Sequence, residues 1–277
     1  DSEARIRKLI ISELEQVIKK YGTDRKTTLI HESDVPAADE EDETPDYPVH
    51  LFLSREGYFK KITLQSLRMS GEQKFKEGDG LLAAYETTNR AELLVFTDKC
   101  QVYKAKCAEF EDSKASVLGD YLPAKLSMDE GETVVAVCLP GDYSGNILFV
   151  YENGKVAKIA ASSYDTKTNR RRLTGAYCDK SPLKAVRMLT EEEELVLYST
   201  EGRALVFSTE QLAPKTTRSS QGVAVLTLKR KHVLDRAVPL AESPIQNVSR
   251  YRTRSLPATG ALLREEDTGE TQISMEI

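Results

Sequence analysis

The sequence predicts an all-β protein in which one hairpin unit repeats to build a propeller-like ring. Four segments share the same order: an apolar strand, a polar residue, a short turn, and a second strand that carries Lys or Arg. Aligning the four turns places Gly57, Cys100, Gly154 and Gly202 in register, at spacings of 43, 54 and 48 residues. A β-rich unit that recurs about every 50 residues is typical of blades arranged in a ring.

The clearest unit is YENGKVAKIA at 151–160, where Asn153 and Gly154 separate two strands rich in β-branched and aromatic residues. An Asn-Gly pair accepts the positive φ angles of a tight turn between twisted strands. Each unit is followed by a polar crossing and then by another apolar strand. We therefore expect strand, turn, basic strand, crossing and strand in every unit across residues 48–262.

The two ends of the chain differ from this repeat. Residues 1–21 place apolar side chains at helical spacing between charges, which predicts an amphipathic helix that packs either on the protein or in a coiled coil. Residues 31–47 are acidic and without a basic residue, so we expect a solvated linker. Residues 263–277 predict either an acidic tail or a ring-closing strand.

The composition is that of a globular protein, with 277 residues, 40% hydrophobic and 30% charged. No stretch approaches the roughly 20 uninterrupted apolar residues of a membrane helix, and no signal-peptide pattern is present, so we expect a cytoplasmic protein without a membrane partner. The four cysteines form no CxxC pair and the three histidines have no cluster of ligands around them. We expect buried free thiols, no metal and no cofactor.

The net charge of −5 conceals an uneven distribution. Residues 1–46 hold 7 basic and 13 acidic residues, which leaves a nearly neutral body with 32 basic and 31 acidic residues. Within that body, residues 211–254 carry nine basic residues against only Asp235 and Glu242. A clustered positive excess is typical of a phosphate-binding surface, whatever the total charge.

The candidate phosphate-binding residues recur in or after the second hairpin strand or form basic runs in the crossings. They are Lys60, Lys61, Arg68, Lys104, Lys106, Lys155, Lys158, Arg170, Arg171, Arg172, Arg203, Arg218, Lys229, Arg230 and Lys231. Recurrence at one register favours a function, because a merely solvated face has no reason to prefer one sign there. The runs 170–172 and 229–231 are equally compatible with exposed, solvated turns.

In their order, five segments resemble the C-terminal part of bacterial type II topoisomerase A subunits, those of gyrase and topoisomerase IV. The segments are KKYGTDRKTTLI, VHLFLSREGYFKKI, ENGKVAKI, TEGRALVF and TTRSSQGVAVLTL, and the resemblance covers nearly the whole chain. It implies a β-pinwheel of about five or six four-stranded blades, built by strand exchange, with basic strands on the outer rim. Double-stranded DNA would be bound and bent there through its phosphates, without reading of bases.

The same resemblance implies which domain precedes this chain and which proteins it assembles with. Residues 1–30 would end the coiled-coil helix of a preceding core domain. The protein partners would be the ATPase B subunit, together with the rest of the A subunit. None of the twelve tyrosines lies in that family's catalytic context, so the chain is not expected to cleave DNA by itself.

One departure concerns the Gln-Arg-Arg-Gly-Gly-x-Gly box of gyrase-type members. The matching crossing, LQSLRMSGEQKFKEGDG, retains only Gln65, Arg68 and Gly71. This degenerate box favours a topoisomerase IV-like protein or a specialised paralogue over a supercoiling gyrase.

Two other classes of function compete with DNA binding. The first is a β-propeller that binds a protein partner. The second is a propeller enzyme, although the blades offer no converging carboxylates, histidines or metal ligands. Salt separates DNA binding from protein binding, because phosphate-driven binding weakens steeply as salt rises whereas an apolar interface scarcely responds.

Overall fold

A computed structural model describes residues 2–22, 44–69, 72–166 and 170–269. The chain divides into two compact units, residues 1–43 and 44–277. In the first unit, α1 (Ser2–Tyr21) is the helix that the apolar spacing predicts, and it has no buried residue. Most of the expected linker, and residues 270–277 of the expected tail, lie outside the described residues. No helix in the described part of the chain is long and apolar enough to cross a membrane.

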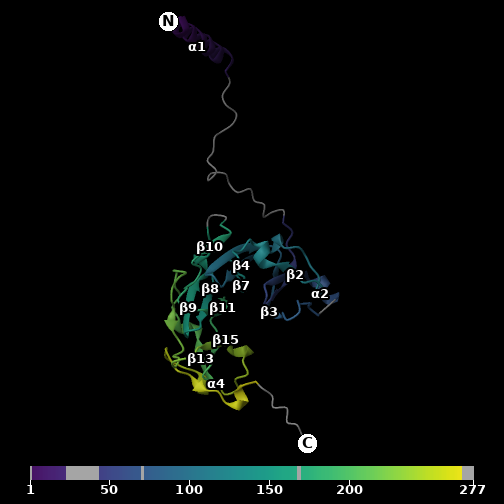
Figure 1. Cartoon of the computed structure of the whole chain (residues 1–277), viewed down its shortest axis with the longest axis vertical. Coiled ribbons are helices and arrows are strands. Elements are labelled where there is room, and N and C mark those ends of the chain that lie inside the picture. The colour runs from purple at the N-terminus through teal and green to yellow at the C-terminus, as the bar shows by residue number, and fades with distance from the viewer. Residues whose placement is uncertain (1, 23–43, 70–71, 167–169, 270–277) are drawn as a thin grey trace. The chain divides into compact units, whose positions relative to one another are not determined.

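The second unit consists of four four-stranded antiparallel sheets, which form the blades of a propeller-like ring (Figure 1). The strand orders are β3-β1-β2-β6 in the first blade, β7-β4-β5-β10 in the second, β11-β8-β9-β14 in the third and β15-β12-β13-β16 in the fourth. The strands are β1 (Pro48–Ser54), β2 (Tyr58–Thr63), β3 (Leu81–Thr88), β4 (Glu92–Thr97), β5 (Gln101–Lys106), β6 (Asp120–Tyr121), β7 (Val134–Cys138), β8 (Asn146–Tyr151), β9 (Lys155–Ala160), β10 (Arg172–Thr174), β11 (Leu183–Leu189), β12 (Glu194–Ser199), β13 (Arg203–Ser208), β14 (Val223–Ala224), β15 (Leu234–Pro239) and β16 (Ala261–Leu262). Short helical segments connect them: α2 (Leu64–Met69), η3 (Cys107–Glu109), α3 (Leu122–Lys125), η4 (Ala161–Ser163), η5 (Thr209–Gln211), η6 (Leu240–Glu242), α4 (Val248–Tyr251) and η7 (Glu265–Asp267).

The first three blades borrow their outermost strand from the chain that follows the next hairpin. β6 follows the second hairpin but pairs with β2 of the first blade. In the same way β10 pairs with β5, and β14 pairs with β9. The fourth blade is completed by β16, which follows it in the described part of the chain without an intervening hairpin. Neighbouring blades are therefore joined by backbone hydrogen bonds of a shared chain, as the resemblance implies.

The hairpin turns require the positive φ that the sequence pattern predicts. Gly57, Gly154 and Gly202 have φ of 87°, 78° and 73°. Cys100 occupies the same position in the second blade and adopts a φ of 56° although it is not glycine. The alignment of the four turns is thus confirmed by their backbone conformation.

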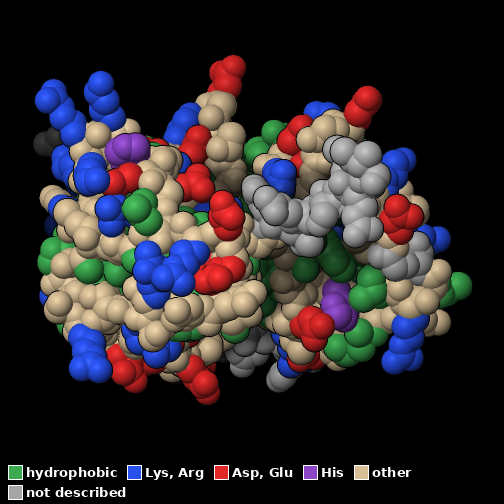
Figure 2. Space-filling model, turned by 90° about the horizontal axis from the view of Figure 1, so that it is seen from below, with side chains coloured by type: hydrophobic (Ala, Val, Ile, Leu, Met, Phe, Trp, Pro, Cys, Tyr) green, Lys and Arg blue, Asp and Glu red, His purple; other side chains and the backbone are tan. Residues whose placement is uncertain are grey.

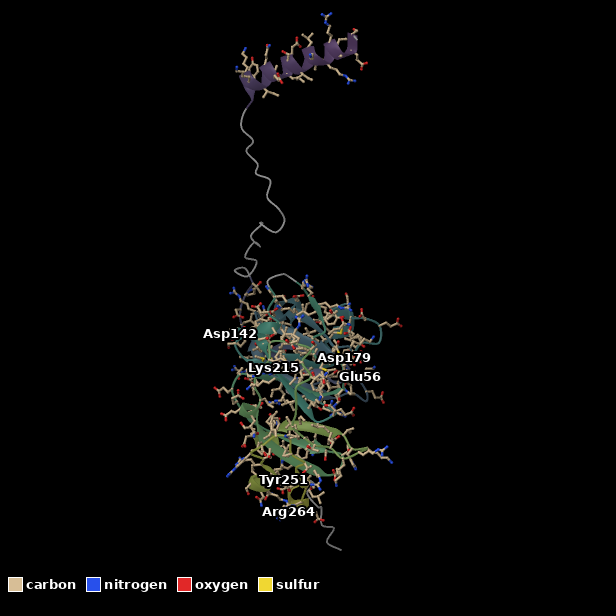
Figure 3. All side chains as sticks on the ribbon, turned by 90° about the vertical axis from the view of Figure 1, so that its left-hand side faces the viewer. Glu56, Asp142, Asp179, Lys215, Tyr251 and Arg264 are labelled. Carbon is tan, nitrogen blue, oxygen red and sulfur yellow. The ribbon has the colours of Figure 1, made fainter. Side chains whose placement is uncertain are left out.

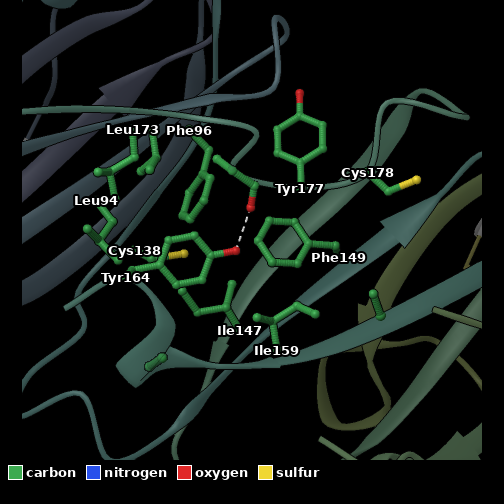
Figure 4. Close-up of a cluster of buried hydrophobic side chains, with 14 of the residues drawn as sticks. Leu94, Phe96, Cys138, Ile147, Phe149, Ile159, Tyr164, Leu173, Tyr177 and Cys178 are labelled. Carbon is green, nitrogen blue, oxygen red and sulfur yellow. Dashed lines mark hydrogen bonds between the residues drawn. The ribbon is translucent and has the colours of Figure 1, made fainter. Parts of the chain in front are cut away.

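The core lies between blades because the first hairpin strands of the second, third and fourth blades, β4, β8 and β12, are apolar on both faces. In β4, Leu93 and Val95 pack toward the first blade whereas Leu94 and Phe96 pack toward the third, and all four are fully buried. Such continuous apolar runs are typical of strands that are covered on both sides. Figure 4 shows the cluster between the second and third blades, where Phe96, Phe149, Tyr164 and Tyr177 meet. Successive blades are therefore held together mainly by burial of apolar surface.

The blade number differs from the expected five or six, since the described residues form four sheets. The apolar pieces after Leu240 do not build a fifth sheet in the described part of the chain. Instead Ile245 and Tyr251 pack on Val196 and Val206, on the face of the fourth blade that has no following blade. The four hairpin units of the sequence thus give one blade each. Residues 240–251, which we call the covering segment, pack on the last of these blades.

Candidate nucleic-acid interface

Three of the predicted phosphate-binding lysines are buried. Lys60, Lys61 and Lys158 are 2%, 4% and 5% exposed. The Lys60 ammonium donates to the carbonyl oxygens of Lys74 at 2.8 Å and Ala115 at 3.2 Å, and burial lowers the pKa of this lysine. Its donors are therefore used inside the protein, as buried charges require.

Lys61, Lys104 and Lys158 occupy one repeated position, four residues after the turn, and each joins its blade to the next. Lys61 donates to Asn89, just before β4, at 2.7 Å, and pairs with Asp112 at 3.1 Å. Lys158 pairs with Glu192, just before β12, and donates to the carbonyl oxygen of Thr209 at 3.3 Å. We call these three side chains clamp lysines, because Lys61 and Lys158 satisfy acceptors beside the following hairpin and Lys104 reaches the next blade through Tyr143.

Lys104 makes the same link more loosely. It is half-buried and pairs with Glu92 at 3.0 Å. The Glu92 carboxylate also accepts a hydrogen bond from the hydroxyl of Tyr143, just before β8, at 2.8 Å. The ammonium lies 5.2 Å from the centre of the Tyr143 ring, so the second blade is tied to the third.

The fourth blade has an apolar residue at the clamp position, Val206, and is fixed by a different set of bonds. Asp267 of η7 is fully buried and accepts hydrogen bonds from the Tyr251 hydroxyl and the Gln246 backbone N–H, both at 2.7 Å. Burial by itself raises the pKa of Asp267, but these hydrogen bonds outweigh it and hold the pKa below its ordinary value. The carboxylate thus anchors the covering segment as an anion.

The outer strand of every blade is preceded by a segment that we call an exchange loop: residues 111–119, 164–171, 213–222 and 252–260. Figure 1 shows β9, β10 and β13 on the outer side of the ring, with β7, β11 and β15 on its inner side. Since the outer strands pair with the second strands of the hairpins, the described residues of the exchange loops lie along the outer rim.

Glycine allows three of the exchange loops to approach the blade closely. Gly119, Gly222 and Gly260 directly precede β6, β14 and β16 with φ of 88°, 71° and 68°. A Cβ atom at these positions would lie 2.3, 2.3 and 2.5 Å from a backbone carbonyl oxygen of the neighbouring strand. Side chains are excluded there, and these glycines are a recurring signal that the sequence analysis missed.

The second exchange loop ends with Arg170 and Arg171, and Arg172 begins β10; all three arginines are exposed. Arg172 makes two hydrogen bonds to Asp129, at 2.6 and 3.0 Å, and another to Gln101. Hydrogen bonds from Gln101 and Arg172 hold the pKa of Asp129 below its ordinary value. Arg171 pairs with Glu109 at 3.2 Å, while Arg170 has no ion pair among the described residues.

The other exchange loops also carry cations, several of which the sequence analysis did not select. Lys114 lies in the first loop, Lys215 and Arg218 in the third, and Arg254 in the fourth. Lys114, Lys215 and Arg254 are exposed, and within the described ranges none of them forms an ion pair. Figure 3, which looks onto the side of the ring, shows Lys215 on the surface facing the viewer. Every exchange loop therefore presents at least one exposed cation, although the first loop also contains the exposed carboxylates Glu111 and Asp112.

The remaining predicted residues are distributed over other surfaces. Arg68 is exposed on α2 and Lys106 is exposed at the end of β5. The others are Lys155, which donates to Gln221 at 3.3 Å; Arg203, which pairs with Glu201 at 3.1 Å; Lys229, which pairs with the same carboxylate at 2.5 Å; and Arg230 and Lys231, which are exposed in the β14–β15 connection. Figure 2 shows Lys and Arg interleaved with Asp and Glu, which agrees with this extensive pairing.

The cysteines and potential ligands give no sign of a metal centre. All four cysteines are free, with Cys107, Cys138 and Cys178 buried and Cys100 half-buried. Among the residues that the structure describes, no group of three His, Cys, Asp or Glu side chains could hold a metal ion.

Comparison with known proteins finds similarity to A subunits of DNA topoisomerase 4. The chain is 28% identical over 234 residues to the A subunit of DNA topoisomerase 4 from Staphylococcus epidermidis, covering 83% of this chain and 29% of that protein. It is 24% identical to the corresponding subunit from Staphylococcus aureus over the same shares. The chain thus spans less than a third of the length of the curated relatives it matches. No family model matches the chain.

Solved structures give the same result for the fold. The C-terminal domain of DNA topoisomerase IV superposes with a TM-score of 0.61 at 25% identity, over 72% of this chain and 63% of that one. The E. coli ParC C-terminal domain gives 0.59 at 14% identity, over 79% and 94% of the two chains, and the DNA gyrase A C-terminal domain gives 0.53 at 14%, over 80% of each.

The fold is therefore the β-pinwheel found in the C-terminal domains of topoisomerase IV and gyrase A. The homologues of the chain are topoisomerase IV A subunits, as the resemblance in sequence predicts.

Proposed function

We propose that the chain is the DNA-binding and DNA-bending C-terminal domain of a bacterial, ATP-dependent type II topoisomerase A subunit. Its partners in the cytoplasm are double-stranded DNA, the ATP-hydrolysing B subunit, and the remainder of the A subunit. The chain contributes no catalytic group and presents DNA to the rest of the enzyme. The observation that supports this proposal most directly is the recurrence of exposed cations in all four exchange loops.

Binding takes place through phosphates along a curved edge. Bending a duplex site of about 20–30 bp costs on the order of 1–6 kcal/mol, so several contacts must act together. One exchange loop per blade supplies such contacts at intervals around the ring. The cations lie in turns and loops rather than on an element shaped for a groove, which favours binding that is indifferent to base sequence.

Carboxylates limit the strength of this binding. Arg171 pairs with Glu109 and Arg172 with Asp129, while Arg252 makes two 2.7 Å hydrogen bonds to Glu194. These arginines must share or exchange their partners when a phosphate arrives. We therefore expect modest affinity that is carried by the cations without an ion pair.

The experiment measures binding of the chain to a short and a long linear duplex with fluorophores at both ends, across a salt series. We expect affinity to fall steeply with salt, and the ends of the long duplex to approach each other. Replacing Arg170→Gln and Arg171→Gln should make the slope of log K against log salt shallower by about 1–2. The control, Arg5→Gln with Lys8→Gln on α1, removes the same charge from the first unit and should leave the slope unchanged.

Failure to bind at low salt would refute the proposal and direct the search to a protein partner. Binding without approach of the duplex ends would refute DNA bending but leave DNA binding in place.

A further inference from the structure

A polar notch lies on the outer rim where the second and third blades meet. Its volume is about 390 Å³ and its lining residues are Ser163, Gly175, Thr216, Thr217, Arg218 and Ser219. Ser163 ends η4 of the third blade, Gly175 follows β10 of the second, and the other four belong to the third exchange loop. This lining combines hydroxyl groups with one guanidinium and contains neither Asp nor Glu.

Arg218 is held in place before any ligand arrives. Its guanidinium lies 6.0 Å from the centre of the Tyr164 ring, and its Nη1 donates to the Ser163 carbonyl oxygen at 3.4 Å. Tyr164 is fully buried, and its hydroxyl donates to the Ala176 carbonyl oxygen at 2.6 Å (Figure 4). A guanidinium held beside a fixed ring and bonded to a carbonyl oxygen loses less conformational entropy on binding, and its remaining N–H donors suit an oxyanion.

The exchange loop presents its hydroxyls from a fixed backbone. Ser163 Oγ donates to the Thr216 carbonyl oxygen at 2.8 Å, and the Ser220 N–H donates to the Thr217 carbonyl oxygen at 3.1 Å. The side chains of Thr217 and Ser219 are exposed, and neither hydroxyl has a hydrogen-bond partner within the described chain. These two hydroxyls are therefore available to an incoming acceptor.

We propose that this notch binds a phosphate group, through the Arg218 guanidinium and the hydroxyls of Thr217 and Ser219. Guanidinium and hydroxyl donors without a competing carboxylate are the chemistry that recognises a phosphate oxyanion. The group can belong to a DNA backbone, in which case the inference rests on the proposed function, or to a free phosphate ion. With DNA, the notch fixes one phosphate at the seam between two blades, whereas Lys215 and Arg170 act through charge at longer range.

The test removes the hydroxyls without changing the charge. Thr217→Val with Ser219→Ala is compared with Thr259→Val with Ser116→Ala, two exposed positions in the fourth and first exchange loops. We expect the notch variant to bind duplex DNA about 5-fold more weakly than the wild-type chain, a typical loss for hydrogen bonds to a charged group in an exposed setting. The control variant should bind as the wild-type chain does.

A second pair of variants tests the geometry of the arginine. Arg218→Lys keeps the charge but loses the planar fork, so it should weaken DNA binding about as much as the hydroxyl variant. Arg55→Lys, at an exposed arginine in the β1–β2 turn outside the exchange loops, should have no effect beyond about 2-fold. Thermal unfolding of each variant checks that the fold is intact.

Titration of the isotope-labelled chain with inorganic phosphate distinguishes the two sources. Loss of DNA affinity in both notch variants supports a backbone phosphate. Unchanged DNA affinity, together with phosphate-induced shifts of the 216–219 amide signals that disappear in the notch variants, supports a free phosphate. If the wild-type chain binds DNA, and the variants change neither the DNA affinity nor the phosphate-induced shifts, phosphate binding by the notch is refuted while the proposed function stands. Absence of DNA binding by the wild-type chain refutes the proposed function separately.

Discussion

Two sets of basic side chains look alike in the sequence and have different surroundings in the fold. The clamp lysines recur four residues after each of the first three turns, and Lys61 and Lys158 are buried against acceptors of the next blade. The exchange-loop cations recur less regularly, and Arg170, Lys215 and Arg254 are exposed without an ion pair in the described chain. The more regular pattern therefore serves assembly of the ring, whereas the less regular one supplies the charge available to a phosphate.

The largest expected effect comes from removing a clamp lysine. Lys158→Ala leaves Glu192 without its partner and opens a gap between the third and fourth blades. We expect the free energy of unfolding to fall by about 2–4 kcal/mol, toward the lower part of the usual range because Glu192 is partly exposed. Urea denaturation measures this change, and DNA affinity of the folded variant should stay the same.

Lys155→Ala is the matched control on the same strand, since Lys155 is half-buried and contacts only Gln221 by its side chain among the described residues. It should change stability by no more than about 0.5 kcal/mol. Equal destabilisation by the two substitutions would show that Lys158 has no special role in joining the blades.

A smaller loss of stability is expected from a substitution at Asp267. This residue fixes the covering segment on the fourth blade, which has no clamp lysine. Asp267→Asn weakens the acceptor for Tyr251 and Gln246 and should cost about 1–2 kcal/mol of unfolding free energy near neutral pH. Because the folded-state pKa of Asp267 lies below its unfolded value, its stabilisation is present above the unfolded pKa and is lost as pH falls through the folded pKa.

The wild-type chain and the Asp267→Asn variant should consequently differ less in their free energy of unfolding below about pH 4. Urea denaturation over a pH series measures it. Glu265→Gln, an exposed carboxylate of the same short helix, is the control and should show no such narrowing. A difference that persists at low pH would show that shape, and not charge, fixes the covering segment.

The smallest effect on folding, and a clear effect on binding, is expected for the cations that sequence analysis did not select. Lys114→Gln, Lys215→Gln and Arg254→Gln together should reduce the salt slope of DNA binding by roughly 2–3. Stability should change by less than about 0.5 kcal/mol per site, because these side chains are exposed. Removing three charges from α1 instead, at Arg5, Lys8 and Lys19, is the control. Equal slopes for the two triple variants would contradict a role of the rim.

The hairpins were predictable because their signals are local. The apolar runs around Asn153 and Gly154 identify both strands and the turn, and the fourfold recurrence identifies the blades. The surroundings of the second-strand lysines were not predictable in the same way. Lys61 meets Asn89, 28 residues away, and Lys158 meets Glu192, 34 residues away, so the burial of each depends on how the next unit docks.

The notch depended on a similar long-range arrangement. The sequence identified Arg218 as a candidate because it lies in a basic crossing. Its position beside Tyr164 was not predictable, because strand exchange brings the third exchange loop against η4, and Arg218 there meets Ser163, 55 residues earlier in the chain. Thr217 and Ser219 carried no signal of their own. The glycines before β6, β14 and β16 could have marked the exchange loops, since each directly precedes a short strand.

Strand exchange also has a consequence for the order in which the protein is made. The first blade cannot close until residues 120–121 have left the ribosome, by which time the whole second hairpin has been synthesised. Each new hairpin therefore completes the blade before it, and the growing chain always carries one sheet with an open edge. A polypeptide that stopped after Leu189 would lack the fourth hairpin and would also leave β9 without β14. Loss of the last hairpin unit thus removes the fourth blade and also leaves the third blade without its outer strand.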